Sequence, residues 1–109
     1  MSFIKVIKAD ELQAGEKLKV DVQGKSILLA NLDGSFYALD DRCPHLGGSL
    51  SRGEMRGSQV FCPKHGAAFD VKTGKNESDA KIAFIKMKVN DARTYPVKVE
   101  DGDVLVDID

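Results

Sequence analysis

Two segments decide how this chain folds: Cys43-Pro44-His45-Leu46-Gly47-Gly48 and Cys62-Pro63-Lys64-His65-Gly66-Ala67-Ala68-Phe69-Asp70. They hold both cysteines and both histidines of the protein, arranged as C-x-H and C-x-x-H. Their prolines and glycines favour tight loops. Because thiolate and imidazole are both metal ligands, the pattern predicts a four-ligand metal site.

A set of two cysteines and two histidines suits either zinc or an iron–sulfur cluster. A zinc finger usually has both thiols on one knuckle and both imidazoles on the other, whereas here each segment carries one of each. This alternation would let one iron of a two-iron cluster take both sulfurs and the other both nitrogens. The spacing favours the cluster, and a zinc-stabilised binding module is the alternative.

Length and charge exclude several classes of protein. A chain of 109 residues is the size of one domain, so we expect a single domain over 1–109. The net charge of −1 argues against a nucleic-acid partner. Without a signal peptide or a membrane-spanning apolar run, we expect a cytoplasmic protein with no membrane partner, in which a disulfide is disfavoured. Nothing in the sequence requires more than a monomer.

Strand patterns cover most of the chain and predict an all-β fold of antiparallel sheets. We expect strands at 3–7, 16–22, 26–32, 35–39, 59–61, 67–71, 94–99 and 104–108, and one helical turn at 9–12. Asp33-Gly34 predicts a two-residue hairpin, and Gly74 a turn with positive φ. Between the two segments, Leu50 is the one obvious apolar anchor, and Gly53 is expected in an exposed turn. The stretch 76–92 fits helix or strand, and we expect it to be extended.

On these two segments the sequence resembles the Rieske-type ferredoxins, small [2Fe-2S] carriers of ring-hydroxylating oxygenase systems. The resemblance covers most of the chain. It implies a Rieske-type fold, in which a base of β-sheets carries a small cluster-binding subdomain at about 41–71. It also implies one cluster per chain, with Cys43 and Cys62 on one iron and His45 and His65 on the other.

The resemblance further implies a docking patch, in which Leu46 and Pro63 shield the cluster and form the apolar surface that a partner covers. High-potential relatives in the cytochrome complexes carry a disulfide between the loops and two hydroxyls directed at the sulfurs. The matching positions in this chain are Gly48, Lys64, Ala67 and Phe69. Because these potential-raising groups are absent, we expect a low potential, near the lower end of the roughly −150 to +300 mV Rieske range.

The function implied by the resemblance is one-electron transfer from a flavin-containing reductase to a terminal oxygenase or a similar acceptor. The chain has no third histidine for the mononuclear iron of the oxygenases and no glycine-rich dinucleotide motif, so we expect a carrier and not an enzyme. Within the same fold, the alternative is a small Rieske-type subunit of a reductase such as nitrite reductase.

Overall fold

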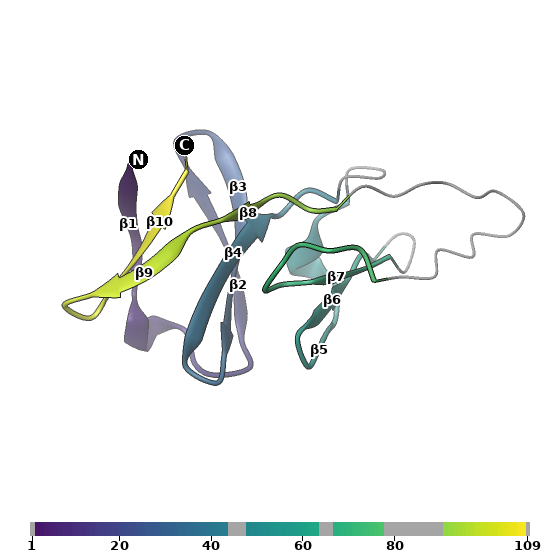
Figure 1. Cartoon of the computed structure of the whole chain (residues 1–109), viewed down its shortest axis with the longest axis horizontal. Coiled ribbons are helices and arrows are strands. Elements are labelled where there is room, and N and C mark those ends of the chain that lie inside the picture. Colours follow the sequence, from purple (N-terminus) through teal and green to yellow (C-terminus); the bar gives the residue numbers. More distant parts are fainter. Residues whose placement is uncertain (1, 44–47, 64–66, 78–90, 109) are drawn as a thin grey trace, which may run out of the picture.

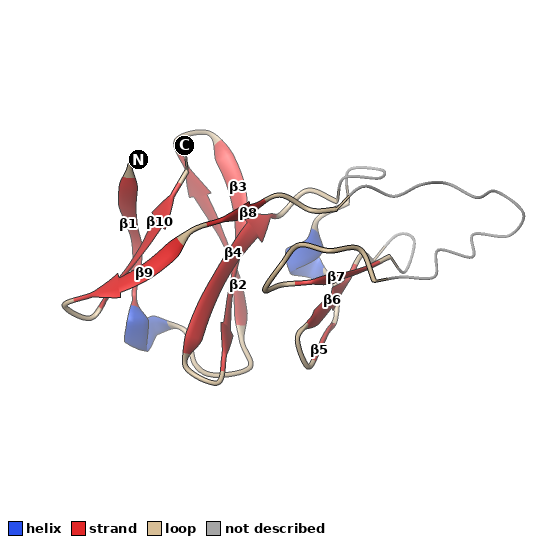
Figure 2. Ribbon diagram, in the orientation of Figure 1, coloured by secondary structure: helices blue, strands red, loops and turns tan. Residues whose placement is uncertain are grey.

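The computed structural model describes residues 2–43, 48–63, 67–77 and 91–108. These residues form three antiparallel sheets and two single-turn 3-10 helices (Figure 1, Figure 2). The all-β antiparallel fold expected from the sequence is therefore confirmed. Within the described residues, no helix has the length and apolar character needed to span a membrane. Of the stretch 76–92, residues 78–90 lie outside the described residues.

The first sheet has the order β1-β10-β9, the second β2-β3-β4-β8 and the third β5-β6-β7. The strands are β1 (Phe3–Lys8), β2 (Lys17–Val22), β3 (Lys25–Leu32), β4 (Ser35–Asp40), β5 (Met55–Arg56), β6 (Gln59–Phe61), β7 (Ala68–Asp70), β8 (Thr94–Tyr95), β9 (Val97–Glu100) and β10 (Asp103–Asp107). The short helices are η1 (Ala9–Glu11) and η2 (Leu50–Arg52). The second sheet stands between the other two in Figure 1.

Strand β3 is buried on both faces, as its uninterrupted apolar sequence predicts. Its residues Ile27, Leu28, Leu29 and Ala30 are all fully buried. Because side chains alternate along a strand, Ile27 and Leu29 enter a first core shared with the first sheet. Leu28 and Ala30 enter a second core shared with the third sheet. One strand thus forms part of the wall of both cores.

In the second sheet, the turn between β3 and β4 is as the sequence predicts, but the burial of one face of β2 is not. Asp33 and Gly34 have φ values of 54° and 93°, which confirms the predicted hairpin between β3 and β4. On β2, the alternation predicts a buried face that includes Leu18. Leu18 is 39% exposed, because the first core reaches only the other end of β2, where Val20 is half-buried and Val22 is buried.

The strand expected at 94–99 is two strands in different sheets. Thr94–Tyr95 pairs with β4 in the second sheet, and Val97–Glu100 pairs with β10 in the first. Pro96 lies between them, and proline has no N–H to continue a ladder. Its carbonyl instead accepts the Asp107 N–H at 2.9 Å. The sequence pattern located the strand residues and missed the crossing between sheets.

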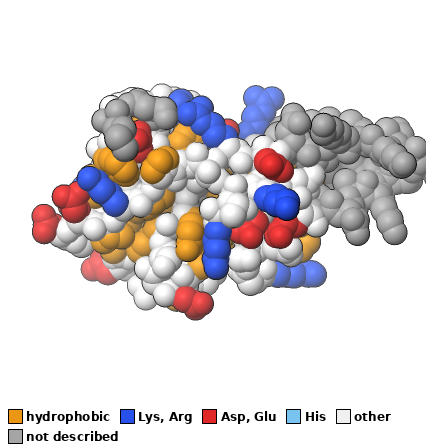
Figure 3. Space-filling model, viewed as in Figure 1, with side chains coloured by type: hydrophobic (Ala, Val, Ile, Leu, Met, Phe, Trp, Pro, Cys, Tyr) orange, Lys and Arg blue, Asp and Glu red, His pale blue; other side chains and the backbone are white. Residues whose placement is uncertain are grey.

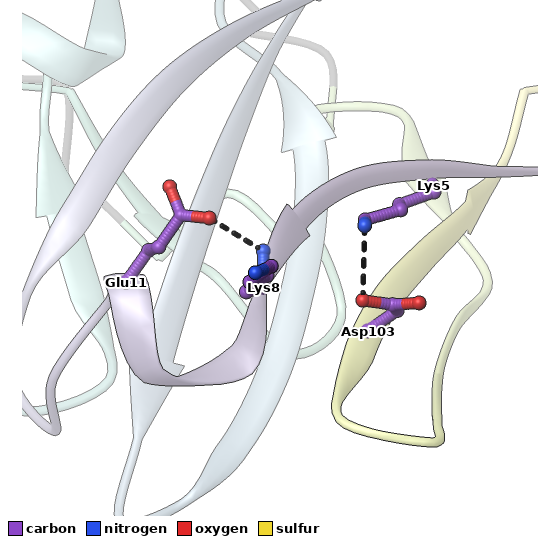
Figure 4. A network of polar contacts seen from close by, with 4 residues as sticks. All are labelled: Lys5, Lys8, Glu11 and Asp103. Carbon is purple, nitrogen blue, oxygen red and sulfur yellow. Dashed lines mark hydrogen bonds and ion pairs between the residues drawn. The ribbon is translucent and has the colours of Figure 1, made fainter.

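The helical turn expected at 9–12 is η1, which joins β1 to β2. Figure 4 shows the Lys8 N–H donating to the Glu11 carboxylate at 3.0 Å, and Lys5 paired with Asp103 of β10 at 3.2 Å. The Lys5 side chain is about half exposed, so this ion pair contributes little to stability. The hydrogen bond at Lys8 defines the start of the turn.

We predict that Gly74→Ala destabilises the protein far more than Gly102→Ala. Both glycines have similar positive φ values, 74° and 78°, so both substitutions strain the backbone. At Gly74 an added Cβ would also lie 2.1 Å from the Ala92 carbonyl oxygen, whereas at Gly102 it meets no atom within 4 Å. Urea denaturation should give a loss of about 3 kcal/mol for Gly74→Ala and about 1 kcal/mol for Gly102→Ala. Equal losses would contradict the close approach to Ala92.

Tyr95 joins β8 to β4 through its side chain as well as its backbone. Its hydroxyl donates a hydrogen bond to the Asp40 carboxylate, and the Arg93 guanidinium lies 4.9 Å from the ring centroid. Burial and the hydrogen bond to Asp40 raise the pKa of Tyr95 to about 12. The neutral phenol is therefore the form that the folded protein prefers.

This preference predicts a loss of stability in alkali. A folded-state pKa above the unfolded value of about 10 means that the unfolded chain releases its proton first, so stability is full below that pH and falls towards about pH 12. Urea midpoints should drop more steeply over this range in the wild type than in Tyr95→Phe, which lacks the hydroxyl. Parallel profiles for the two proteins would contradict the prediction.

Candidate functional site

The third sheet leads directly into the second of the two predicted ligand segments. Val60 of β6 pairs with Phe69 of β7, and both side chains are fully buried in the second core. Strand β6 ends at Phe61, so Cys62 is the first residue after it, and β7 begins at Ala68. Residues 62–67, the second ligand loop, therefore connect two paired strands.

The first ligand loop, residues 43–48, follows β4 and is closed in the same way as the second. The Cys43 N–H donates to the Gly48 carbonyl at 2.6 Å, and the Cys62 N–H donates to the Ala67 carbonyl at 2.7 Å. Each hydrogen bond spans five residues and begins at a cysteine that precedes a proline. One loop follows a strand of the second sheet and the other joins two strands of the third. Both loops have the same length, and each begins with a cysteine.

Both cysteines are buried, with Cys43 1% exposed and Cys62 2% exposed. They belong to one cluster of buried side chains, the second core, together with Leu50 and Phe69. A thiolate in such surroundings is costly unless a cation compensates its charge. Thiolates are also the protein ligands that hold iron–sulfur clusters. Two buried thiols in one core therefore fit a metal centre.

The other predicted site residues divide into described and undescribed ones. Gly48, Ala67 and Phe69 are buried around the cysteines, and Pro63 is exposed. The ligands and flanking residues predicted at four further positions lie outside the described residues: His45, Leu46, Lys64 and His65. The described structure thus brings together the cysteine half of the predicted ligand set.

Asp41 lies at the site, although the sequence pattern does not predict a role for it. It is 3% exposed, and its carboxylate accepts hydrogen bonds from the Ser51 N–H, at 2.7 Å, and from the Ser49 hydroxyl. Its backbone carbonyl accepts the Leu50 N–H at 2.7 Å. Aspartate commonly binds nearby N–H groups at turns, but the sequence does not distinguish Asp41 from Asp40 in this role.

Gly53 was expected in an exposed turn, and this expectation is wrong. Gly53 is buried, and its N–H donates to the Leu50 carbonyl at 3.0 Å, at the end of η2. A Cβ added at Gly53 would lie 1.7 Å from the Phe61 carbonyl oxygen. The glycine is therefore required by a close backbone approach, which a turn-forming sequence does not reveal.

Charged side chains cover the strand that precedes Cys62. The Arg56 guanidinium lies 5.3 Å from the centroid of the Phe61 ring and 3.1 Å from the Glu54 carboxylate. A hydrogen bond from Arg56, and then its positive charge, lower the pKa of Glu54. Both charged groups are exposed, so water screens the pair. Over the face shown in Figure 3, charges of both signs are interspersed.

A cavity of about 560 Å³ is lined by none of the described residues of the two ligand loops. It is formed where the β3–β4 turn approaches the β5–β6 turn, and its lining includes Leu32, Tyr37, Met55 and Lys72. Neither cysteine contributes to it. Chemistry therefore singles out the two buried thiols, and not this cavity, as the functional site.

Comparison with known proteins agrees with this assignment. The model of the Rieske [2Fe-2S] domain family matches residues 2–103. The chain is 32% identical, over 108 residues, to the ferredoxin component of the naphthalene 1,2-dioxygenase system of Pseudomonas putida, an alignment that covers 99% of this chain and 97% of that protein.

Solved structures give the same result for the fold. The Sphingomonas yanoikuyae B1 ferredoxin matches with a TM-score of 0.85 and 27% identity, covering 99% of this chain and 100% of the other. A chain in the complex of reduced oxygenase and oxidized ferredoxin of carbazole 1,9a-dioxygenase matches with a TM-score of 0.83 and 31% identity, covering 95% and 91%. The chain belongs to the Rieske [2Fe-2S] domain family, as its paired cysteine loops predict.

Proposed function

We propose that this protein is a one-electron carrier that uses a Rieske [2Fe-2S] cluster, and is not itself an enzyme. It would take an electron from a flavin-containing reductase and pass it to a terminal oxygenase. The family assignment supports the cluster. The relatives named as ferredoxin components, and the structure of a ferredoxin in complex with an oxygenase, support the role and the acceptor. The donor follows from the resemblance.

One observation carries the assignment of the ligands: two buried cysteines begin two loops that are closed by matching backbone hydrogen bonds. These two cysteines would bind one iron, and the family resemblance implies that His45 and His65 would bind the other. The bound cluster supplies reversible one-electron chemistry. The side chains of the second core keep water away from the two sulfurs. The hydrogen bonds from Cys43 and Cys62 close the two loops.

The surface around the loops would form the docking site. Pro63 is exposed beside the buried Cys62, which supports its proposed place, with Leu46, in an apolar patch that a partner covers. A small apolar contact suits a carrier that must dissociate after each transfer. We further propose a single domain, with the cluster-binding subdomain at about 41–71, that works as a monomer. Cysteines serving as ligands and not as a disulfide fit the reducing cytoplasm.

The two alternatives that the sequence left open gain no support. The zinc module keeps the same four residues, but the family whose model matches is a [2Fe-2S] family. The small reductase subunit keeps the fold, but the matching relatives are named as ferredoxin components of dioxygenase systems. The carrier is the function that the observations favour.

The ligand assignment predicts that Cys43→Ser and Cys62→Ser each abolish the cluster. Iron and sulfide analysis should give two of each per wild-type chain, from the composition of the cluster, and almost none in either variant. The reduced wild type should show the EPR signal of a two-iron cluster with mixed sulfur and nitrogen ligands. Ser35→Ala, on the exposed start of β4, is the matched control and should bind iron normally. A colourless wild type with one zinc per chain would overturn the proposal.

We also propose that the potential is low, because Ala67 and Phe69 offer no hydroxyl to the sulfurs. Both side chains are buried in the second core with Cys62. Ala67→Ser should raise the midpoint potential by roughly 50 mV, equivalent to one added hydrogen bond of about 1 kcal/mol to the reduced cluster. Phe69→Tyr should raise it similarly.

Redox titration measures these shifts, and Ala68→Ser provides the control. Ala68 is buried beside Ala67, but only Ala67 belongs to the second core with the cysteines. The hydroxyl that Ala68→Ser adds should therefore leave the midpoint potential within about 10 mV of the wild-type value, far below the shift expected from one hydrogen bond to the cluster. A wild-type midpoint well above zero, or no rise in Ala67→Ser, would contradict the low-potential assignment.

A further inference from the structure

The segment from Ser49 to Gly53 connects the two ligand loops in space. It starts directly after the first ligand loop, forms the single turn η2, and ends against β6, the strand that precedes Cys62. Leu50, in the middle, is fully buried in the second core with both cysteines. We call residues 49–53 the brace.

The N-terminal end of the brace is held by Asp41, two residues before Cys43. The Asp41 carboxylate binds the Ser51 N–H and the Ser49 hydroxyl, and its carbonyl accepts the Leu50 N–H. The Ser49 and Ser51 hydroxyls also share a hydrogen bond, with their oxygens 2.9 Å apart. Because Asp41 is buried, these hydrogen bonds are protected from competition with water. The stem that enters the first ligand loop is thereby joined to the stem that leaves it.

The C-terminal end of the brace touches the peptide bond that leads into Cys62. Gly53 lies so close to the Phe61 carbonyl that any side chain on Gly53 would displace it. The next residue, Glu54, accepts the Phe61 N–H at 2.9 Å through its carbonyl. Phe61 is thus hydrogen-bonded at its N–H and closely contacted at its carbonyl, and Cys62 follows directly in the chain.

We propose that the brace sets the position of Cys62 relative to Cys43, with Asp41 and Gly53 as its two positioning residues. This inference rests on the proposed ligand role of the cysteines. Each loop is closed by its own hydrogen bond, which by itself leaves the distance to the other loop undetermined. The brace adds such a constraint, because Asp41 binds its first residues, Gly53 lies against the Phe61 carbonyl, and the next residue, Glu54, binds the Phe61 N–H. A two-iron cluster tolerates little error in the placement of its ligands.

The test compares Asp41→Ala with Asp41→Asn. Both variants remove the same negative charge, so their electrostatic effects on the cluster are alike. In Asp41→Asn the amide oxygen can still accept the Ser51 N–H and the amide nitrogen can donate to the Ser49 oxygen. The Ala variant loses both bonds. We expect the cluster of Asp41→Ala to be lost about ten-fold faster than that of Asp41→Asn. Its EPR line shape and visible circular dichroism should also change, while those of the Asn variant stay near wild type.

The second comparison sets Gly53→Ala against Gly57→Ala. Gly57 lies in the adjacent β5–β6 turn, where an added Cβ meets no atom within 4 Å, although its φ of 59° makes the substitution mildly destabilising. Gly53→Ala should therefore alter the EPR spectrum and speed cluster loss about ten-fold, as expected for overpacking against a rigid neighbour. Gly57→Ala should lower the melting temperature without changing the spectrum.

Each outcome separates the brace from the proposed function. A wild type without an iron–sulfur EPR signal refutes the proposed function itself. A wild type with that signal, together with equal behaviour of Asp41→Ala and Asp41→Asn or an unchanged spectrum in Gly53→Ala, refutes the brace. If Asp41→Ala does not fold, Ser49→Ala decides, because it removes one bond of the same network. An altered spectrum then supports the brace, and a wild-type spectrum overturns it.

Discussion

The double burial of β3 is the constraint on which the rest of the structure depends. Ile27 and Leu29 pack against the first sheet, while Leu28 and Ala30 pack against the sheet that leads to Cys62. A slip of one residue in the pairing of β3 would exchange the two sets of side chains and disturb both cores. The core of the base and the core that holds both cysteines therefore share one wall, and the register of β3 sets the side chains of both.

Burial outweighs surface charge in this arrangement. A large apolar side chain that is fully buried contributes about 1.5–3 kcal/mol, whereas an exposed ion pair contributes at most about 1 kcal/mol. The ion pair Lys5–Asp103 is of the second kind, and water screens the exposed pair Glu54–Arg56. The polar contacts with more influence are buried ones such as those of Asp41, which lies where two chain segments must be joined beside the centre.

Features encoded by neighbouring residues were predictable, and features created by packing were not. The apolar run of β3, the Asp33-Gly34 turn and the cysteine spacing each carry their signal within a few residues. The change of sheet at Pro96 and the close approach at Gly53 depend on residues distant in sequence. A glycine with an ordinary φ looks like any other loop glycine until the opposing carbonyl is known. The ligand pattern could be predicted because cysteines and histidines in this spacing are rare. The brace that we propose to position the two cysteines could not be predicted.

Loop closure also limits how the proposed cluster can be tuned. The N–H groups of Cys43 and Cys62 are directed to the carbonyls that close their loops. The next residue in each loop, Pro44 or Pro63, has no N–H. The first two positions of both loops therefore offer no backbone donor to the sulfurs. Within the loops, a backbone donor would have to come from a later residue, and Ala67 adds no hydroxyl there. Donors to sulfur stabilise the more negative reduced state, so the lack of a donor at these particular positions agrees with the low potential proposed above.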